Sequence, residues 1–285
     1  MPAISELTIY PIKSCAGISL NEAVMTASGL RHAGVSDREW MLVDSNGLFL
    51  TQREYPRMAS LRVTVGEDVL CVDAVRMTTL RIPLQAATAA QTIAVKVWDF
   101  EIQAEDAGDS AASWFSTALE TACRLVRFPA QGKRFANTKW TGDTLAPTRF
   151  ADGYPMLLIS EASLDDLNRR AAAQGRAAVP MNRFRPNIVI SGIEAFEEDY
   201  AASYLLDNGI QLRPVKPCPR CPIPAVDQSD GTVGDNPVDI LQSYRANPIV
   251  DGEITFGMNV ILEQGAEKII RVGDLLDMPF AFDTL

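Results

Sequence analysis

Two cysteines in a proline-rich segment are the residues whose type and spacing best suggest chemistry. Residues 216–224 read KPCPRCPIP, so Cys218 and Cys221 form a C-x-x-C pair with Arg220 between them. Because proline fixes φ and lacks a backbone donor, we expect this segment to be a stiff, extended loop and not a helix. Such a loop would hold two thiols in a fixed frame beside a cation that favours the thiolate form.

The residues alone leave four interpretations of this pair open. A thioredoxin-like redox pair needs its first cysteine at a helix N-terminus, which the prolines disfavour. A zinc site needs two further ligands, and the remaining candidates, Cys15, Cys71, Cys123 and His32, are distant in the sequence. The pair could also be two ordinary loop cysteines. In the fourth interpretation, a single thiolate binds a transition metal whose other ligands come from a cofactor.

The only histidine, His32, limits the other catalytic schemes. A Ser-His-Asp triad, a histidine-rich zinc site and most histidine general-base mechanisms would all depend on this one residue, whose neighbours predict a loop. The sequence also contains no G-x-x-x-x-G-K-[ST] loop and no G-x-G-x-x-G motif after a strand, so the common nucleotide-phosphate sites are missing.

Composition and charge indicate an ordinary globular protein that is acidic overall. The 285 residues include 26 Lys and Arg against 36 Asp and Glu, a net charge of −10. Nucleic-acid binding is not expected, because it requires a basic face. No apolar run approaches the length of about 20 residues that a spanning helix needs, and no signal peptide is evident, so we expect no membrane partner. The 5 scattered cysteines indicate reduced thiols and a cytoplasmic location.

The first half of the chain, which would position part of this chemistry, is predicted to be mostly β. The spacing of its strands is typical of an antiparallel barrel or sandwich. A type I′ hairpin is expected at Asn46-Gly47, and a helix capped by Asp109 or the next serine is expected up to Leu119. The predicted strands are residues 41–43, 48–51, 60–65, 69–72, 77–82 and 94–104.

The second half is predicted to be mixed α and β around a sheet or barrel. Residues 129–155 combine Pro, Gly and charge without periodicity, so we expect a long connection or functional loop with the subdomain boundary near its start. Beyond it, a helix begins at Ser160 and Glu161. The predicted strands are residues 156–159, 188–190, 254–262 and 269–275.

Several separated segments resemble the MOSC family, named after the molybdenum cofactor sulfurase C-terminal domain. CPRC at 218–221 followed by PIPAVD, and RFRPNIVI at 183–190, are similar to the two signatures of that domain. In the first half, the segments that resemble the β-barrel subdomain preceding it are YPIKSCAG (10–17), DREW (37–40), LTQR (50–53) and PR (56–57). The similarity spans nearly the whole chain, and its architecture resembles the amidoxime reducing components of mitochondria and their bacterial counterparts.

The resemblance implies a fold and a division of the chain. The fold class is β-rich, mixed α+β, with an antiparallel β-barrel-like subdomain packed on a MOSC β-barrel domain that carries a few helices. The N-terminal subdomain, with one helix, would cover residues 1–128 and the MOSC domain residues 129–285.

The resemblance also implies a molybdenum cofactor, Mo-molybdopterin, whose metal takes one protein thiolate. By motif position the metal ligand and catalytic residue is Cys221, and Cys218 is not required. The implied cofactor-binding residues are Lys13, Ser14, Arg38, Asp152, Tyr154, Arg185, Asn187, Pro219 and Arg220. Each has a structural alternative as a surface charge, a salt-bridged residue or a turn residue.

Charge supports this implication independently of the motifs. The cationic residues at 13, 38, 53, 57, 183, 185 and 220 all fall in the segments that carry the resemblance. An acidic chain that binds a phosphorylated anion must gather positive charge locally. The sequence therefore predicts a basic site within an acidic protein.

The activity implied by the resemblance is the two-electron reduction of small N-hydroxylated compounds from N–OH to N–H. Protons would come from water or from a carboxylate such as Asp152, the second candidate catalytic residue. The 5 cysteines do not supply an iron–sulfur cluster, and no ferredoxin domain follows, so we expect a separate electron donor, a ferredoxin-like protein or a flavin reductase. The alternative is a non-catalytic module that carries molybdenum cofactor or sulfur on the same cysteine.

Overall fold

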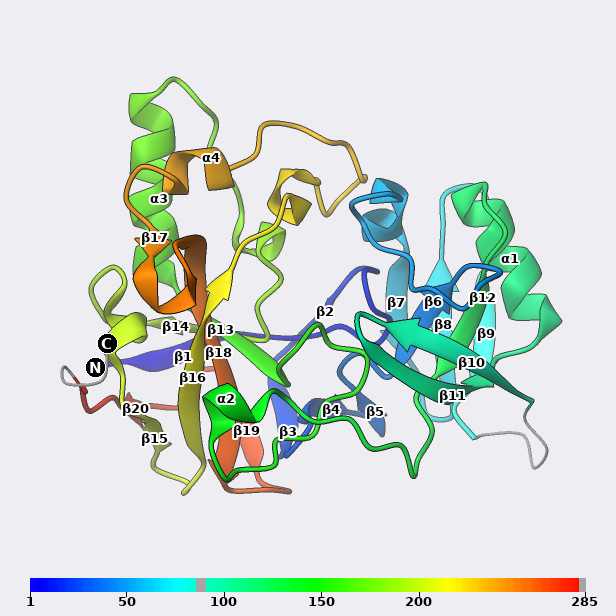
Figure 1. The fold of residues 1–285 in the computed structure, drawn as a ribbon, viewed down its shortest axis with the longest axis horizontal. Helices are drawn as coiled ribbons and strands as arrows, with labels where there is room; N and C mark the ends of the chain where they lie inside the picture. Colours follow the sequence, from blue (N-terminus) through cyan, green and yellow to red (C-terminus); the bar gives the residue numbers. More distant parts are fainter. Residues whose placement is uncertain (86–90, 282–285) are drawn as a thin grey trace.

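A nine-stranded sheet forms the framework of one half of the computed structural model, which describes residues 1–85 and 91–281 (Figure 1). Its strands run in the order β2-β1-β14-β13-β18-β16-β15-β20, with β17 paired to β18. They are Ala3–Ile9 (β1), Ile18–Leu20 (β2), Met156–Ser160 (β13), Ile188–Ser191 (β14), Tyr204–Leu206 (β15), Gln211–Pro219 (β16), Ala246–Asn247 (β17), Glu253–Gln264 (β18) and Leu276–Asp277 (β20). Neighbours in this sheet are antiparallel except β13 and β14.

Three smaller antiparallel sheets complete the β structure. Their orders are β10-β11-β12-β6, β19-β3-β4-β5 and β7-β8-β9. The strands are Glu22–Thr26 (β3), Gly29–His32 (β4), Val35–Ser36 (β5), Trp40–Val43 (β6), Arg62–Val65 (β7), Val69–Asp73 (β8), Leu80–Pro83 (β9), Thr92–Val97 (β10), Phe100–Asp106 (β11), Arg124–Arg127 (β12) and Ile269–Arg271 (β19). The predicted β-rich, mixed α+β fold is thereby confirmed.

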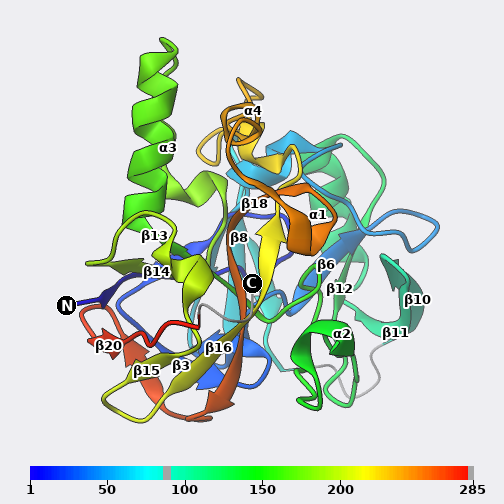
Figure 2. The same cartoon turned by 60° about the vertical axis from the view of Figure 1, so that its left-hand side comes forward.

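The described residues form four α-helices, which lie at the periphery of the sheets (Figure 1). The α-helices are Asp109–Leu119 (α1), Thr138–Thr141 (α2), Glu161–Ala173 (α3) and Val238–Leu241 (α4). Short 3₁₀ turns cover Pro56–Ser60, Met181–Arg183, Glu197–Tyr200, Ile223–Ala225 and Pro248–Val250. Helices α1 and α3 stand at opposite ends of the molecule in Figure 1, and Figure 2 shows α3 projecting from it. None of the described helices is both long and apolar enough to cross a bilayer.

The two halves of the chain share hydrogen-bonded sheets. Strand β1 pairs with β14 and strand β3 pairs with β19, so residues before and after position 128 lie in the same sheets. Aliphatic side chains such as Ile9, Leu158 and Val260 fill the core against the large sheet. A second core surrounds Trp40 and Phe115 in the other half. The division of the chain at residue 128 stays a prediction.

Local capping explains where the two longer helices begin. Helix α3 starts as predicted, because the Ser160 side chain accepts a hydrogen bond of 3.1 Å from the Ser163 N–H. The predicted cap of α1 is wrong, since Gly108 takes that position with φ 90°. Asp109 is instead the first helical residue, and its carboxylate pairs with Arg124 at 2.8 Å.

Two β predictions in the first half need correction. The chain does turn back after β6, but only Gly47 has a positive φ, so the turn is not type I′. The Asp44 carboxylate holds it by accepting from the N–H groups of Asn46 and Leu48. The single run predicted over 94–104 is a hairpin of β10 and β11. His32 ends β4 and does not lie in a loop.

The second half departs from prediction in three places. The loop over 129–155 contains the short helix α2, and the run 269–275 forms only β19 and an isolated bridge at Leu275. The proline-rich segment is extended up to Pro219 as predicted, but it is part of β16 and pairs with β18. Register shifts next to Pro214 and Pro217 let the strand accommodate residues without N–H donors. The chain after Cys221 forms one 3₁₀ turn, because proline suits the first turn of a helix.

Candidate active site

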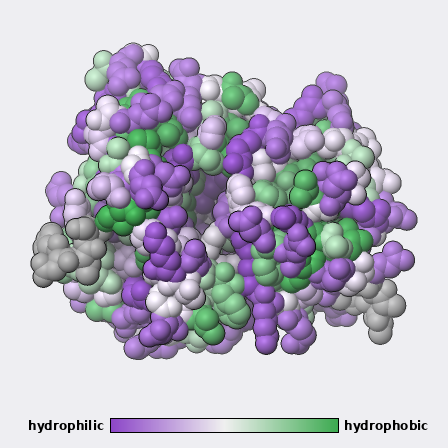
Figure 3. All heavy atoms as spheres, in the orientation of Figure 1, coloured by the Kyte–Doolittle hydropathy of each residue, from purple (hydrophilic) through white to green (hydrophobic). Residues whose placement is uncertain are grey.

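A cavity of about 280 Å³ lies where the N-terminal turn, the start of β13 and the end of β16 meet. Figure 3 shows a hollow in the middle of this face, bordered by hydrophilic residues. The structure brings every candidate site residue to this cavity. Those residues are Lys13, Ser14, Arg38, Asp152, Tyr154, Arg185, Asn187, Pro219, Arg220 and Cys221.

Positive charge dominates the wall of the cavity. The cationic lining residues are Lys13, Arg38, Arg53, Arg185, Lys216 and Arg220. Among the lining residues of the described chain, Asp152 is the only acid. The cavity is therefore basic although the protein is acidic, as the sequence predicts. Two of the cations expected there lie elsewhere, since Arg57 pairs with Glu120 and Arg183 pairs with Asp227.

Three of the site residues adopt left-handed backbone conformations. The φ angles of Ser14, Arg38 and Arg185 are 67°, 47° and 56°. Such conformations are uncommon outside glycine and persist where surrounding contacts enforce them, often at functional sites. The Ser14 turn is closed by a hydrogen bond of 3.1 Å from the Cys15 N–H to the Ile12 carbonyl, and the Gln52 side chain donates to the Ser14 carbonyl at 2.7 Å. Their positions at the cavity make these three residues candidates for a functional role.

Lys13 and Asp152 form an ion pair in the cavity wall. Lys13 Nζ lies 2.5 Å from Asp152 Oδ1; the lysine side chain is 6% exposed and the aspartate side chain 71% exposed. Burial lowers the pKa of Lys13, opposed by the charge of Asp152. Desolvation is the largest single effect and favours the neutral form of Asp152, but the charge and hydrogen bond of Lys13, the hydrogen bond from Trp98 and the charge of Arg38 together outweigh it. The pKa of this carboxyl is therefore held well below its usual value. Arg134 fixes the loop by donating to the Asp152 carbonyl at 2.9 Å.

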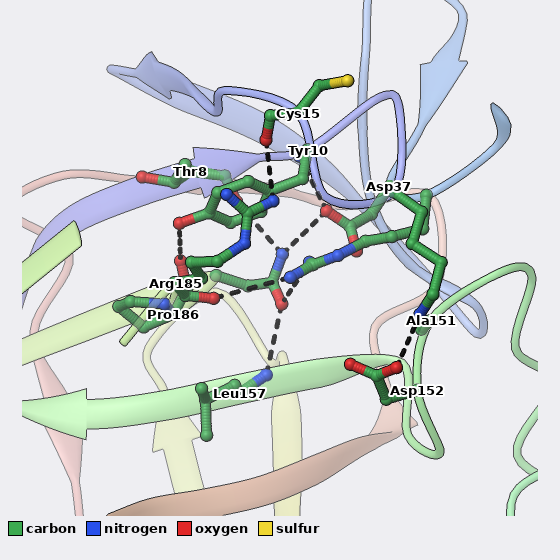
Figure 4. Close-up of polar contacts among 12 residues, drawn as sticks. Thr8, Tyr10, Cys15, Asp37, Ala151, Asp152, Leu157, Arg185 and Pro186 are labelled. Carbon is green, nitrogen blue, oxygen red and sulfur yellow. Dashed lines mark hydrogen bonds and ion pairs between the residues drawn. The ribbon is translucent and has the colours of Figure 1, made fainter. Parts of the chain in front are cut away.

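Tyr10 holds the two arginines whose backbone is left-handed. The guanidinium carbons of Arg38 and Arg185 both lie 4.2 Å from the centre of its ring, which favours cation–π attraction. The Tyr10 hydroxyl donates to the Pro186 carbonyl at 3.2 Å, and Arg185 donates to the Cys15 carbonyl at 2.7 Å (Figure 4). Burial, more than any other cause, lowers the pKa of Arg185. Tyr10 thus holds both guanidinium groups in place, and the buried Asp37 carboxylate pairs with Arg38 at 2.5 Å.

Asn187 connects this pair to the sheet. Its Oδ1 accepts from Arg38 at 3.1 Å and from the Leu157 N–H at 3.2 Å, and its Nδ2 donates to Asp37 at 2.9 Å and to the Thr8 carbonyl at 3.1 Å. Figure 4 draws these bonds between β1, β13 and the arginine segment. Asn187 lines the cavity, but its side-chain amide makes its four hydrogen bonds to other groups of the protein. Its place in the structure favours a role in orienting Arg38 over direct contact with a ligand.

The C-x-x-C segment places both of its cysteines in the cavity wall. Cys218 and Cys221 are both partly buried and free. Arg220 Nη1 donates to Cys218 Sγ at 3.2 Å, and Nη2 donates to the Phe184 carbonyl at 2.9 Å. Within residues 1–85 and 91–281, Arg220 Nε is buried without a hydrogen-bond partner. Arg220 is therefore positioned beside the first cysteine, with one donor left over.

Tyr154 and the residues that sequence reasoning missed complete the wall. Desolvation raises the pKa of Tyr154 to about 12, so its phenol is neutral. Gln52 is fully buried and donates to the Ser14 carbonyl at 2.7 Å. Lys216 also lines the cavity and was not predicted. Gln52 lies in the LTQR segment and Lys216 begins the proline-rich segment, so their polar side chains within these motifs could have identified them.

In the described part of the chain, no three His, Cys, Asp or Glu side chains converge in a way that could hold a metal ion. A metal bound by Cys221 would therefore need other ligands from outside these side chains.

Comparison with known proteins identifies the family. A family model for the MOSC N-terminal beta barrel domain matches residues 1–122, and one for the MOSC domain matches residues 146–277. The chain is 37% identical over 246 residues to mitochondrial amidoxime reducing component 2 of Bos taurus, covering 85% of this chain and 72% of that protein. This chain belongs to the MOSC-domain family.

Further relatives agree with this assignment and confirm the resemblance. Mitochondrial amidoxime-reducing component 1 of Homo sapiens is 33% identical to the MOSC protein over 283 residues, covering 95% of this chain and 81% of that one. Molybdenum cofactor sulfurase of Oryza sativa subsp. japonica is 30% identical over 272 residues, covering 90% of this chain but only 32% of that protein.

Proposed function

We propose that this MOSC protein is a molybdenum-cofactor-dependent reductase that converts small N-hydroxylated compounds from N–OH to N–H. The observation that carries the proposal is a single cavity that joins Cys221 to six cationic side chains. Support also comes from relatives named amidoxime reducing components, which are 33–37% identical over most of their length. An amidoxime carries the N–OH group that such a reaction would remove.

The donor set fits a phosphorylated pterin cofactor. Lysine and arginine side chains suit a phosphate dianion, and the buried Nε–H of Arg220 is a donor that a bound anion could take. Cys221 supplies a soft sulfur ligand of the type that transition metals bind. The cavity volume of about 280 Å³ is near the lower end of ligand pockets, roughly 300 Å³.

In the proposed mechanism the protein binds the cofactor, orients the substrate and sets the charge of the groups around them. When bound, the molybdenum cofactor would supply the two electrons that reduce the N–OH group. Arg38 and Arg185, preorganised by Tyr10, would hold the anionic part of the cofactor, and the Cys221 thiolate would hold the metal. Asp152 stays ionised because its pKa is lowered. It therefore accepts a hydrogen bond from the substrate. Water supplies the two protons: one forms the new N–H bond, and the other joins the released oxygen as water.

The two electrons come from outside the chain in this proposal. The C-x₄-C-x₂-C spacing of a plant-type iron–sulfur site is absent from the sequence, so a separate donor, a ferredoxin-like protein or a flavin reductase, would deliver them. The cytoplasmic location is part of the same proposal and rests on cysteine usage.

Turnover of an amidoxime by metal-loaded protein tests the function. The chain is produced in a host that makes molybdenum cofactor, its molybdenum content is measured by mass spectrometry, and benzamidoxime is supplied with reduced methyl viologen under anaerobic conditions. We expect benzamidine to form at a rate proportional to molybdenum content. A variant with Cys221→Ser should be inactive, whereas Cys71→Ser, in β8 and outside the cavity, should match the unchanged protein.

Two outcomes would contradict the proposal. Absence of turnover at about one molybdenum per chain would support the carrier of cofactor or sulfur, a function consistent with the similarity to molybdenum cofactor sulfurase. One zinc per chain without molybdenum would support a zinc-binding module instead.

A further inference from the structure

Trp98 lies at the tip of the β10–β11 hairpin in a backbone conformation that bulky residues rarely adopt. Val97 pairs with Phe100, which leaves a two-residue turn, and the φ of Trp98 is 54°. Glycine is the usual residue for a positive φ at such a turn. Strained residues of this kind persist where other contacts hold them, and they concentrate at functional sites.

The Trp98 indole is hydrogen-bonded to the carboxylate of the candidate active site. Its Nε1–H donates to Asp152 Oδ1 at 3.1 Å, and the same oxygen accepts from Lys13 Nζ at 2.5 Å. Two donors on one oxygen fix the orientation of the carboxylate. Among the described residues, no hydrogen bond occupies Asp152 Oδ2, so this oxygen is left for a ligand.

Neighbouring side chains immobilise the indole although it is 43% exposed. The ring centre of Phe49 lies 5.0 Å away at an interplanar angle of 59°, and the Arg53 guanidinium lies 5.1 Å from the indole centre. Arg53 and Asp152 both line the cavity, so the indole is at its rim. Contacts with Phe49, Arg53 and Asp152 thus hold the indole, which is suited to keeping the Asp152 carboxylate in one orientation.

We propose that Trp98 is a positioning residue for the reductase reaction: with Lys13 it orients Asp152 so that the second carboxylate oxygen accepts a hydrogen bond from the N–H or O–H of the N-hydroxylated substrate. This inference rests on the proposed function. It adds a residue from a hairpin that none of the sequence motifs includes. The role is distinct from catalysis, because the indole acts through Asp152.

Kinetics of matched variants test the role in the loaded enzyme. Trp98→Phe keeps the ring against Phe49 but removes the donor, and we expect kcat/KM to fall about 5- to 10-fold, as for loss of an ordinary hydrogen bond, because this contact is exposed to water. Trp114→Phe also removes an indole hydrogen bond, 2.7 Å to the Thr78 carbonyl, but from helix α1 outside the cavity, and should change kcat/KM less than twofold.

A double variant separates positioning from a structural effect. If Trp98 acts through Asp152, Trp98→Phe combined with Asp152→Ala, which removes the acceptor, should be no more than twofold worse than Asp152→Ala alone. An unchanged kcat/KM in Trp98→Phe would overturn the proposal. So would losses that multiply fully in the double variant.

Indole resonances supply a readout that needs neither cofactor nor turnover. Protein labelled with ¹⁵N-tryptophan should show 4 indole N–H signals, and Trp98→Phe identifies one of them by its loss. Asp152→Asn should move that signal, because it removes a charged acceptor, whereas Asp143→Asn, on an exposed residue, should not. A Trp98 signal unmoved by Asp152→Asn would overturn the contact. Inactive wild-type protein with full molybdenum would instead overturn the proposed function, and the resonance result would stand separately.

Discussion

Replacing Asn187 by alanine should destabilise the protein strongly even without cofactor. The side chain is 2% exposed, and its amide makes four hydrogen bonds. Two are to the charged side chains of Arg38 and Asp37, and two are to backbone groups of Leu157 and Thr8. Bonds to charged groups contribute about 1.5–3 kcal/mol each and neutral ones about 0.5–1.5 kcal/mol each, so the four together give about 4–9 kcal/mol. We expect a loss near the lower end, about 4 kcal/mol, because Asn187 lines the cavity and water there can replace part of the amide.

The Asn187→Ala loss should also depend on pH. Burial raises the pKa of Asp37, and the bond from Asn187 lowers it again. Without that bond the folded-state pKa of Asp37 rises further above its unfolded value, so ionising this carboxyl costs more stability. The destabilisation should therefore begin to grow only as pH rises through the raised folded-state pKa of Asp37, and it should become constant once Asp37 is ionised in both folded proteins.

Urea unfolding of the apoprotein at pH 4 and pH 8, followed by fluorescence and circular dichroism, measures both effects. Asn168→Ala is the matched control, because that amide bonds only the backbone of Val179, at 3.0 and 2.9 Å. It should lose about 1–2 kcal/mol with no pH dependence. If Asn187→Ala lost no more than Asn168→Ala at pH 8, the argument that this amide supports the arginine pair would be refuted.

Three further predictions concern the thiols and the sheet. Cys221→Ser should lose bound molybdenum while Cys218→Ser retains most of it, as measured by metal analysis; equal losses would indicate paired ligation. Desolvation raises the pKa of Cys15 to about 12, so at pH 8 only about one molecule in 10⁴ carries the reactive Cys15 thiolate. When native apoprotein is treated with iodoacetamide, peptide mapping should find Cys15 unmodified and Cys221 modified. Gly257→Ala should destabilise the protein by about 2 kcal/mol in urea unfolding, because the φ of Gly257 is +79° and the new Cβ would lie 2.5 Å from the Ile159 side chain. A loss below about 0.5 kcal/mol, which is the usual scatter of surface substitutions, would contradict this packing.

Local patterns in the sequence determined much of the secondary structure. The Ser160 cap fixed the start of α3, because a serine oxygen satisfies a free N–H within its own turn. Short β-branched and aliphatic runs gave β7, β8, β13 and β14 nearly as they occur. The paired cysteines and the family motifs also directed attention to Cys221 and to the cations of the cavity. These features depend on neighbours a few residues away, which a sequence displays directly.

Only the tertiary structure decided how the site is assembled. The pairing of β1 with β14 brings Tyr10 to Arg185, across more than half the chain, and residue spacing carries no record of such a contact. Left-handed backbone at Ser14 and Arg38 opposes local preference, so it exists only because long-range contacts enforce it. The contact of Trp98 with Asp152 likewise arises from packing between separate segments. The chemistry was visible in the sequence, but its geometry required the fold.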